Sequence, residues 1–133
     1  MGSYTLAATL DRPYEETVQA VRKALDAQGF GVLTEIDLRA TLKKKLDVDV
    51  AKQIILGACR PQLAYEAMQT DPSLATVLPC NVVVRAIDDD TTIVEAFDPD
   101  VMMGLSGRAG LDMVATDARK RLAAMLRTLT EEN

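Results

Sequence analysis

Two β-branched segments on either side of a short acidic turn place the firmest constraint on the fold of this chain. Residues 80–87 read CNVVVRAI and residues 91–97 read TTIVEAF, with three aspartates at 88–90 between them. Two such runs joined by a short turn are typical of a β-hairpin. We therefore expect an antiparallel hairpin. The three aspartates should form its turn and not a cation site, because adjacent aspartates in a turn diverge.

The spacing of apolar residues predicts three further strands and four helices. The strands are expected at residues 4–10, 32–36 and 51–58. The helices are expected from Pro13 to a stop at Gly29, at 37–48, from Pro61 to about Met68, and at 109–129. The order β-α-β-α-β-α-β-β-α indicates an α+β protein, with a largely antiparallel sheet covered by helices on one face. A chain of 133 residues matches a single domain over residues 1–133.

Composition narrows the classes of function. The chain has no histidine, which removes the usual general base and the commonest neutral metal ligand. Whether it is an enzyme stays open, with a non-catalytic role favoured. A net charge of −5 and only five aromatic residues argue against nucleic acid as a partner. No apolar run approaches the roughly 20 residues of a membrane span, so we expect no membrane partner and a cytoplasmic location.

The two cysteines, Cys59 and Cys80, do not form a C-x-x-C motif, and a structural zinc site needs four ligands. We therefore predict no metal and no cofactor. The two thiols can approach each other if the third and fourth strands are neighbours, and whether they meet is left open. The basic segment LKKKL at 42–46, with Arg39, is either a solvated helix face or a contact patch for an acidic partner.

The segment GACRP at 57–61 puts Cys59 between a strand and a helix that Pro61 can open. Backbone N–H groups at the helix start, together with Arg60, would lower the pKa of the Cys59 thiol and make it reactive. The alternative is that a small, soft residue packs well at this junction. Cys80, which opens a strand, is expected to be a buried small hydrophobic residue.

Two features near the last helix complete the set of candidate residues. GLSGRAG at 104–110 is glycine-rich and precedes a helix, so it is either a connector or an anion site that uses Arg108. Met102 and Met103 either belong to the core or line an adaptable apolar pocket or subunit interface.

Two stretches of the chain carry a resemblance to a known family. These are GACRPQLAYEAMQTDPSLATVLPCNVVV, at 57–84, and FDPDVMM, at 97–103. With their Cys, Pro, L-P-C and D-P positions they resemble the bacterial family called domain of unknown function 302, over nearly the whole chain. The resemblance implies a compact α+β domain, often a dimer, with no established activity and no catalytic residue to assign.

Our leading hypothesis is a non-catalytic ligand-binding or protein-interaction module that acts as a homodimer. Its site would lie where three segments converge: the Cys59–Pro61 junction, the start of the Cys80 strand and the DPDVMM segment. Such a site would suit a small apolar or anionic ligand. The candidate ligand-binding residues are Cys59, Arg60, Pro61, Cys80, Met102, Met103 and Arg108. The alternative is a thiol-dependent redox or sulfur-transfer protein with Cys59 as its nucleophile.

Overall fold

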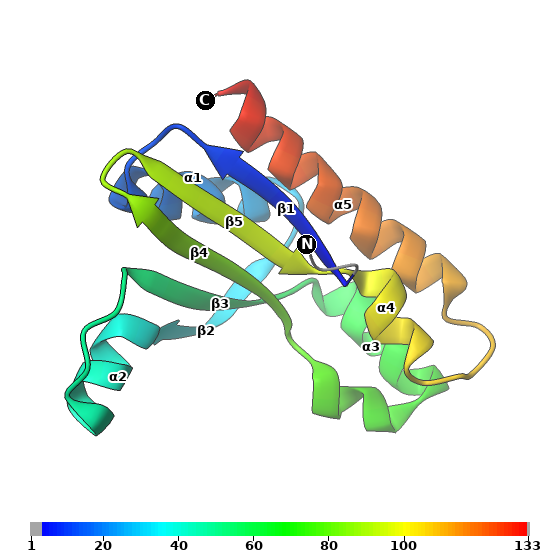
Figure 1. Ribbon diagram of the computed structural model, residues 1–133. Helices are drawn as coiled ribbons and strands as arrows, with labels where there is room; N and C mark the ends of the chain where they lie inside the picture. The colour runs from blue at the N-terminus through cyan, green and yellow to red at the C-terminus, as the bar shows by residue number, and fades with distance from the viewer. Residues whose placement is uncertain (1–3, 133) are drawn as a thin grey trace.

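The computed structural model describes residues 4–132 and contains an antiparallel sheet of five strands (Figure 1). The strands lie in the order β1-β5-β4-β3-β2, and each neighbouring pair is antiparallel. Their bounds are β1 Thr5–Leu10, β2 Gly31–Asp37, β3 Gln53–Cys59, β4 Cys80–Asp88 and β5 Thr91–Phe97. The helices are α1 Tyr14–Ala27, α2 Leu38–Leu46, α3 Pro61–Thr70, the 3-10 helix η1 Pro72–Val77, α4 Pro99–Gly104 and α5 Asp112–Glu131. The predicted α+β fold and element order are confirmed.

The predicted hairpin is formed by β4 and β5, which pair through Val84 and Val94. The backbone N–H of Asp90 donates a 2.9 Å hydrogen bond to Oδ1 of Asp88 and closes the turn. An aspartate carboxylate that binds the backbone two residues ahead is a common turn device. The hairpin lies inside the sheet, with β1 beside β5 and β3 beside β4. Both of its strands are therefore paired on both sides.

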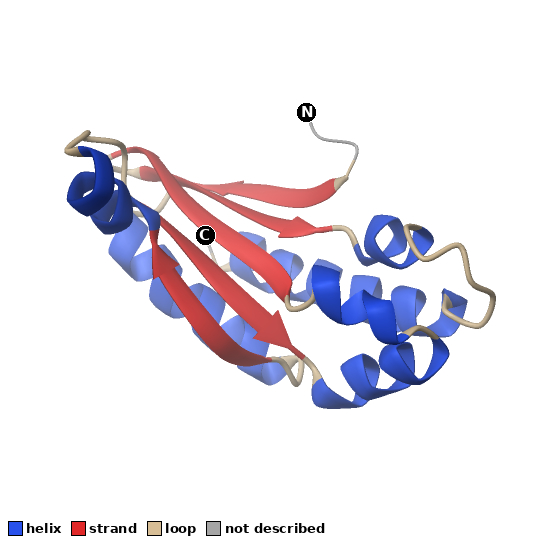
Figure 2. Ribbon diagram, turned by 90° about the horizontal axis from the view of Figure 1, so that it is seen from below, coloured by secondary structure: helices blue, strands red, loops and turns tan. Residues whose placement is uncertain are grey.

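Helices α1 and α5 cover one face of the sheet (Figure 2). Side chains alternate along a strand, so the buried Val82, Val84 and Val94 all point to this face. They pack in a core with fully buried leucines of the two helices, such as Leu25 of α1 and Leu122 of α5. Burial of this apolar surface is the main stabilising contribution to the sheet and its two covering helices.

A second core lies at the end of the sheet where β3 and β5 finish. The buried residues in it are Leu63, Ala67, Leu74, Cys80, Met102, Met103, Leu111, Val114, Ala115 and Ala118. They come from α3, η1, the start of β4, α4 and the first half of α5. This second core therefore joins the short helices to the same α5 that covers the sheet.

The short helices η1 and α4 add to the predicted order, and each begins at an Asp-Pro pair. Asp71 is the N-cap of η1 and accepts a 3.1 Å hydrogen bond from the Ser73 N–H. Asp98 is the N-cap of α4 and accepts a 2.9 Å bond from the Asp100 N–H. Asp at the N-cap followed by Pro at the first helical position is a favourable helix start.

The last helix begins later than predicted. The expected start was about residue 109, whereas α5 begins at Asp112. Gly110 has φ +95, a conformation that ends a regular helix and suits glycine. The turn at Gly110 therefore belongs to the connection between α4 and α5.

Helix α2 differs from the other helices because none of its nine residues is buried. The predicted N-cap is confirmed, since Oδ1 of Asp37 accepts a 2.9 Å hydrogen bond from the Ala40 N–H. In Figure 1 the helix projects from the end of the sheet beside β2 and β3. It follows β2, which is an edge strand of the sheet.

Candidate functional site

The candidate site is built where β3 ends and β4 begins. Cys59 is the last residue of β3, and Cys80 is the first residue of β4. The two strands pair in a register that places Ala58 opposite Cys80. Pro61 then starts α3, with Arg60 at its N-cap. The question left open by the sequence is thereby answered: β3 and β4 are neighbours, and their pairing brings the two cysteines to the same corner of the sheet.

Four of the predicted ligand-binding residues line a small cavity at this corner: Cys59, Arg60, Cys80 and Met103. The cavity has a volume of about 20 Å³. Its other walls are largely apolar and come from Phe30, Ala58, Leu63, Ala64, Leu78, Val114 and Ala118. A space of this size holds about one water molecule. It therefore suits a single atom or ion better than a larger organic ligand.

The remaining candidate residues lie elsewhere. Pro61 is the first residue of α3 and does not line the cavity. Met102 is fully buried in the second core and also lies outside the cavity wall. Arg108 is exposed, and its Nε lies 3.8 Å from Oδ1 of Asp71. The glycine-rich loop thus places Arg108 beside a carboxylate, away from the two cysteines.

Of the two interpretations of Cys59, the structure supports the packed thiol and not the activated one. Burial raises the pKa of the Cys59 thiol above its usual value. Burial also raises the pKa of Cys80, to about 11, and repulsion from Cys59 once that group is a thiolate adds to this rise. The apolar surroundings therefore outweigh any effect of the helix start or of Arg60. Both groups stay protonated thiols near neutral pH, which argues against Cys59 as a ready nucleophile.

Within residues 4–132, the guanidinium group of Arg60 has one distant ion-pair partner and one nitrogen without a hydrogen bond. Its Nη1 lies 3.9 Å from Oδ2 of Asp117, a carboxylate that also binds Arg121 at 3.0 Å. The Arg60 side chain passes close to Gly29, where an added Cβ would lie 3.1 Å from Nε. This Nε is buried and has no hydrogen-bond partner among the described residues. A buried donor without a partner lowers the stability of the fold. A hydrogen-bond acceptor or an anion bound beside this Nε would remove that cost.

Asp71 links the second core to the glycine-rich loop. The hydroxyl of Ser106 donates a 2.5 Å hydrogen bond to Oδ2 of Asp71. This bond, together with the Ser73 N–H and the charge of Arg108, lowers the pKa of Asp71. Asp71 was not among the predicted site residues. The Asp-Pro pair at 71–72 is the sequence signal for the helix start at this position.

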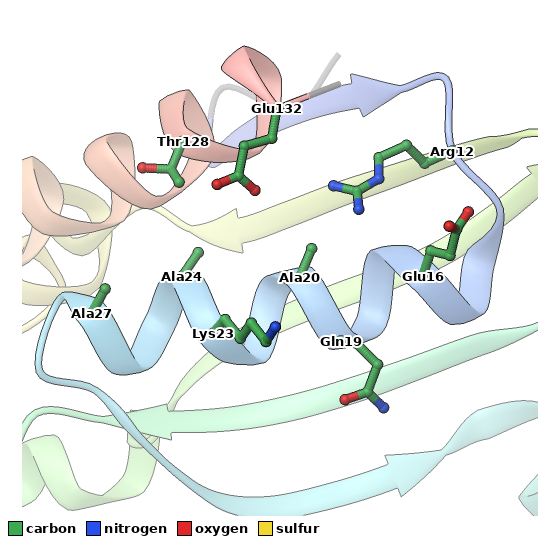
Figure 3. A pocket seen from close by; sticks show the side chains of 9 residues that line it. All are labelled: Arg12, Glu16, Gln19, Ala20, Lys23, Ala24, Ala27, Thr128 and Glu132. Atoms are coloured by element: carbon green, nitrogen blue, oxygen red, sulfur yellow. The ribbon is translucent and has the colours of Figure 1, made fainter.

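A second, larger cavity lies between α1 and the end of α5 and was not predicted (Figure 3). Its volume is about 520 Å³. Ala20, Ala24 and Ala27 form a row on the side of α1 that faces Thr128 of α5 and Glu132, the residue after that helix. Arg12, Glu16, Lys23 and Glu132 contribute charges of both signs to its walls. The recurrence of alanine every three or four residues along α1 is a sequence signal for this cavity.

Two findings bear on the predicted partners. The described part of the chain contains no group of three or more Asp, Glu or Cys side chains arranged to hold a metal ion. Within residues 4–132, no helix has the length and apolar character needed to cross a membrane.

Comparison with known proteins agrees with this architecture. The family model described as domain of unknown function DUF302 matches residues 6–129. The fold is similar to a crystal structure of an uncharacterized conserved DUF302 protein from Bacillus stearothermophilus, with a TM-score of 0.87 and 27% identity. That similarity covers 96% of this chain and 99% of the other. No curated protein matches the chain. Because the family model extends over nearly the whole sequence, this chain belongs to the DUF302 family.

Proposed function

We propose that this protein is a non-catalytic interaction module that acts as a homodimer, with α2 of each copy packed against the other copy. The observation that carries the proposal is the exposure of α2, which has no buried residue. An isolated helix shorter than about 12–15 residues is only marginally stable in water. A nine-residue helix that has no buried residue and packs mainly against β2 and β3 would therefore gain stability from a partner.

The segment around α2 also concentrates exposed apolar surface. Four of the ten exposed large hydrophobic side chains of the described residues fall between positions 33 and 48: Leu33, Ile36, Leu46 and Val48. Leu38, Leu42 and Leu46 recur every four residues, which places them on one side of the helix. Leu38 and Leu42 are half-buried, whereas Leu46 is exposed. Exposed apolar side chains gathered in one segment mark interaction sites.

Charge favours a second copy of this chain as the partner. Helix α2 carries Arg39, Lys43, Lys44 and Lys45 and no acidic residue. The whole chain has a net charge of −5, and α2 contributes four positive charges, so the rest of the chain has a net charge of −9. Only Lys43 of these four forms an ion pair among the residues described, with Asp47 and Asp49. A basic helix with unpaired lysines complements the acidic surface that a second copy presents.

Leu46→Glu tests the proposal, with Leu105→Glu as its matched control. The two leucines have the same exposed fraction, 66%, but Leu105 lies at the end of α4 and not on α2. Light scattering across a dilution series should show a dimer for the wild type and for Leu105→Glu. Leu46→Glu should raise the dissociation constant on the order of tenfold or more.

Two results would oppose the proposal. One is a wild-type protein that stays a 14.4 kDa monomer at every concentration. The other is an equal response of the two variants. Circular dichroism of both variants checks that neither substitution unfolds the chain.

The other parts of the proposal follow from the same features. We also place the protein in the cytoplasm. We treat residues 1–133 as one domain, because the helices and strands described share two adjoining cores. A non-catalytic role is supported by the absence of histidine and by the raised pKa of both thiols. The raised pKa values also disfavour the thiol-dependent alternative based on Cys59.

A further inference from the structure

Three sulfur-bearing side chains from three separate elements line the small cavity at the corner of the sheet. Cys59 comes from the end of β3, Cys80 from the start of β4 and Met103 from α4. These residues are distant in sequence and are brought together only by the fold. The cavity volume of about 20 Å³ is that of one water-sized species. A single small ion in this cavity would therefore have three sulfur-bearing side chains among its neighbours.

The wall of the cavity also carries a positive charge that is only weakly paired. Arg60 lines the same cavity, and its buried Nε has no hydrogen-bond partner in the described chain. The Asp117 carboxylate, 3.9 Å from Nη1, lies closer to Arg121. A species that gives the cavity one net negative charge would balance Arg60.

We propose that Cys59, Cys80 and Met103 form a binding site for one copper(I) ion, with Arg60 balancing the charge of the complex. Thiolate and thioether sulfur are soft ligands that select copper(I). Binding converts two neutral thiols to thiolates and releases two protons. The bound unit, one Cu⁺ with two thiolates and a neutral thioether, has a charge of −1. No electron is transferred, because the ion enters and stays as copper(I).

The other walls of the cavity favour this ion over the common divalent metals. Zinc takes four nitrogen, sulfur or oxygen ligands in its structural sites. The cavity offers two thiols, and the described residues hold no group of three or more acidic or cysteine side chains arranged to hold a metal ion. Phe30, Leu63 and Val114 supply apolar surface around the sulfur atoms. Such a shell limits the access of water and of hard, hydrated cations.

Competition with a coloured copper(I) chelator tests the site. The reduced full-length protein is titrated into the copper(I) complex of bicinchoninate under nitrogen, with ascorbate present. Loss of the chelator colour should show transfer of one copper ion per chain. Cys59→Ser should weaken binding by at least roughly tenfold, the lower end of what even outer-shell substitutions cost a metal site.

Met103→Leu and Met102→Leu form the decisive pair. Both replace a buried methionine of the second core with a residue of similar volume, but only Met103 lines the cavity. Met103→Leu should weaken copper(I) binding at least roughly tenfold, whereas Met102→Leu should bind as the wild type does. Thermal unfolding of both variants monitors the fold. No transfer of copper to the wild type, equal affinities of the two variants, or an unchanged affinity in Cys59→Ser would each overturn the proposal.

Discussion

The hydroxyl of Thr34 occupies the space that a side chain at Gly57 would need. A Cβ placed on Gly57 would lie 2.1 Å from Oγ1 of Thr34 and 2.8 Å from Cγ of Pro79. Thr34 and Gly57 are directly opposite each other in the pairing of β2 with β3. The edge strand that leads to α2 is thus held close to β3 by the absence of a side chain at one position.

Gly57→Ala is expected to destabilise the protein by about 1–3 kcal/mol, the usual cost of overpacking. Gly104→Ala is the control, since no neighbouring atom lies within 4 Å of the position of its added Cβ. Its stability should stay within about 0.5 kcal/mol of the wild type. Urea unfolding measures both. Equal stabilities of the two variants would show that the contact with Thr34 does not constrain the strand.

Alkylation of the native protein should be slow near neutral pH at both cysteines, and slowest at Cys80. Burial raises the pKa of both thiols, so little thiolate is present. The rate should rise as the pH increases toward the raised pKa values, and denatured protein should react faster at both positions. Mass spectrometry of the labelled peptides locates the reaction. Fast labelling of Cys59 below pH 7 would restore the thiol-dependent hypothesis.

Ser106→Ala should lower stability at neutral pH and reduce the sensitivity of the fold to acid. The Ser106 hydrogen bond is the largest cause of the lowered pKa of Asp71. A carboxylate with a lowered folded-state pKa stabilises the fold above its unfolded pKa, near 3.8. This contribution is lost as the pH falls through the folded-state pKa. The difference between the variant and the wild type should therefore be largest at neutral pH and shrink in acid.

Ser73→Ala provides the matched control for this experiment. Ser73 binds Asp71 through its backbone N–H, which alanine retains. The pH profile of its unfolding free energy should follow the wild type. If the difference between Ser106→Ala and the wild type were the same at every pH, the hydrogen bond would not be coupled to the ionisation of Asp71.

The hairpin and the order of elements were predictable because they depend on local patterns. The β-branched runs of β4 and β5 and the spacing of Leu122 and Leu129 in α5 carry their structure in short stretches of sequence. The sequence left open whether Cys59 and Cys80 meet, because that depends on the pairing of β3 with β4, which local patterns do not fix.

The separation of Met102 from Met103 could not be predicted in the same way. Neighbouring residues on a helix point about 100° apart, so one methionine reaches the cavity while the other stays in the core. The sequence does not fix how α4 is rotated. The pKa of Cys59 likewise depends on burial by segments far along the chain, such as Phe30 and Val114, and local features predicted the opposite direction.

Amide hydrogen exchange of α2, measured over a range of protein concentrations, tests the central claim most directly. In the monomer, the amide hydrogens of a nine-residue helix with no buried residue exchange rapidly. If α2 packs against a second copy, the exchange of residues 38–46 should slow as concentration rises, while the central strand β4 stays protected throughout. Rapid exchange of α2 at every concentration would contradict the account of this protein as a dimer joined through that helix.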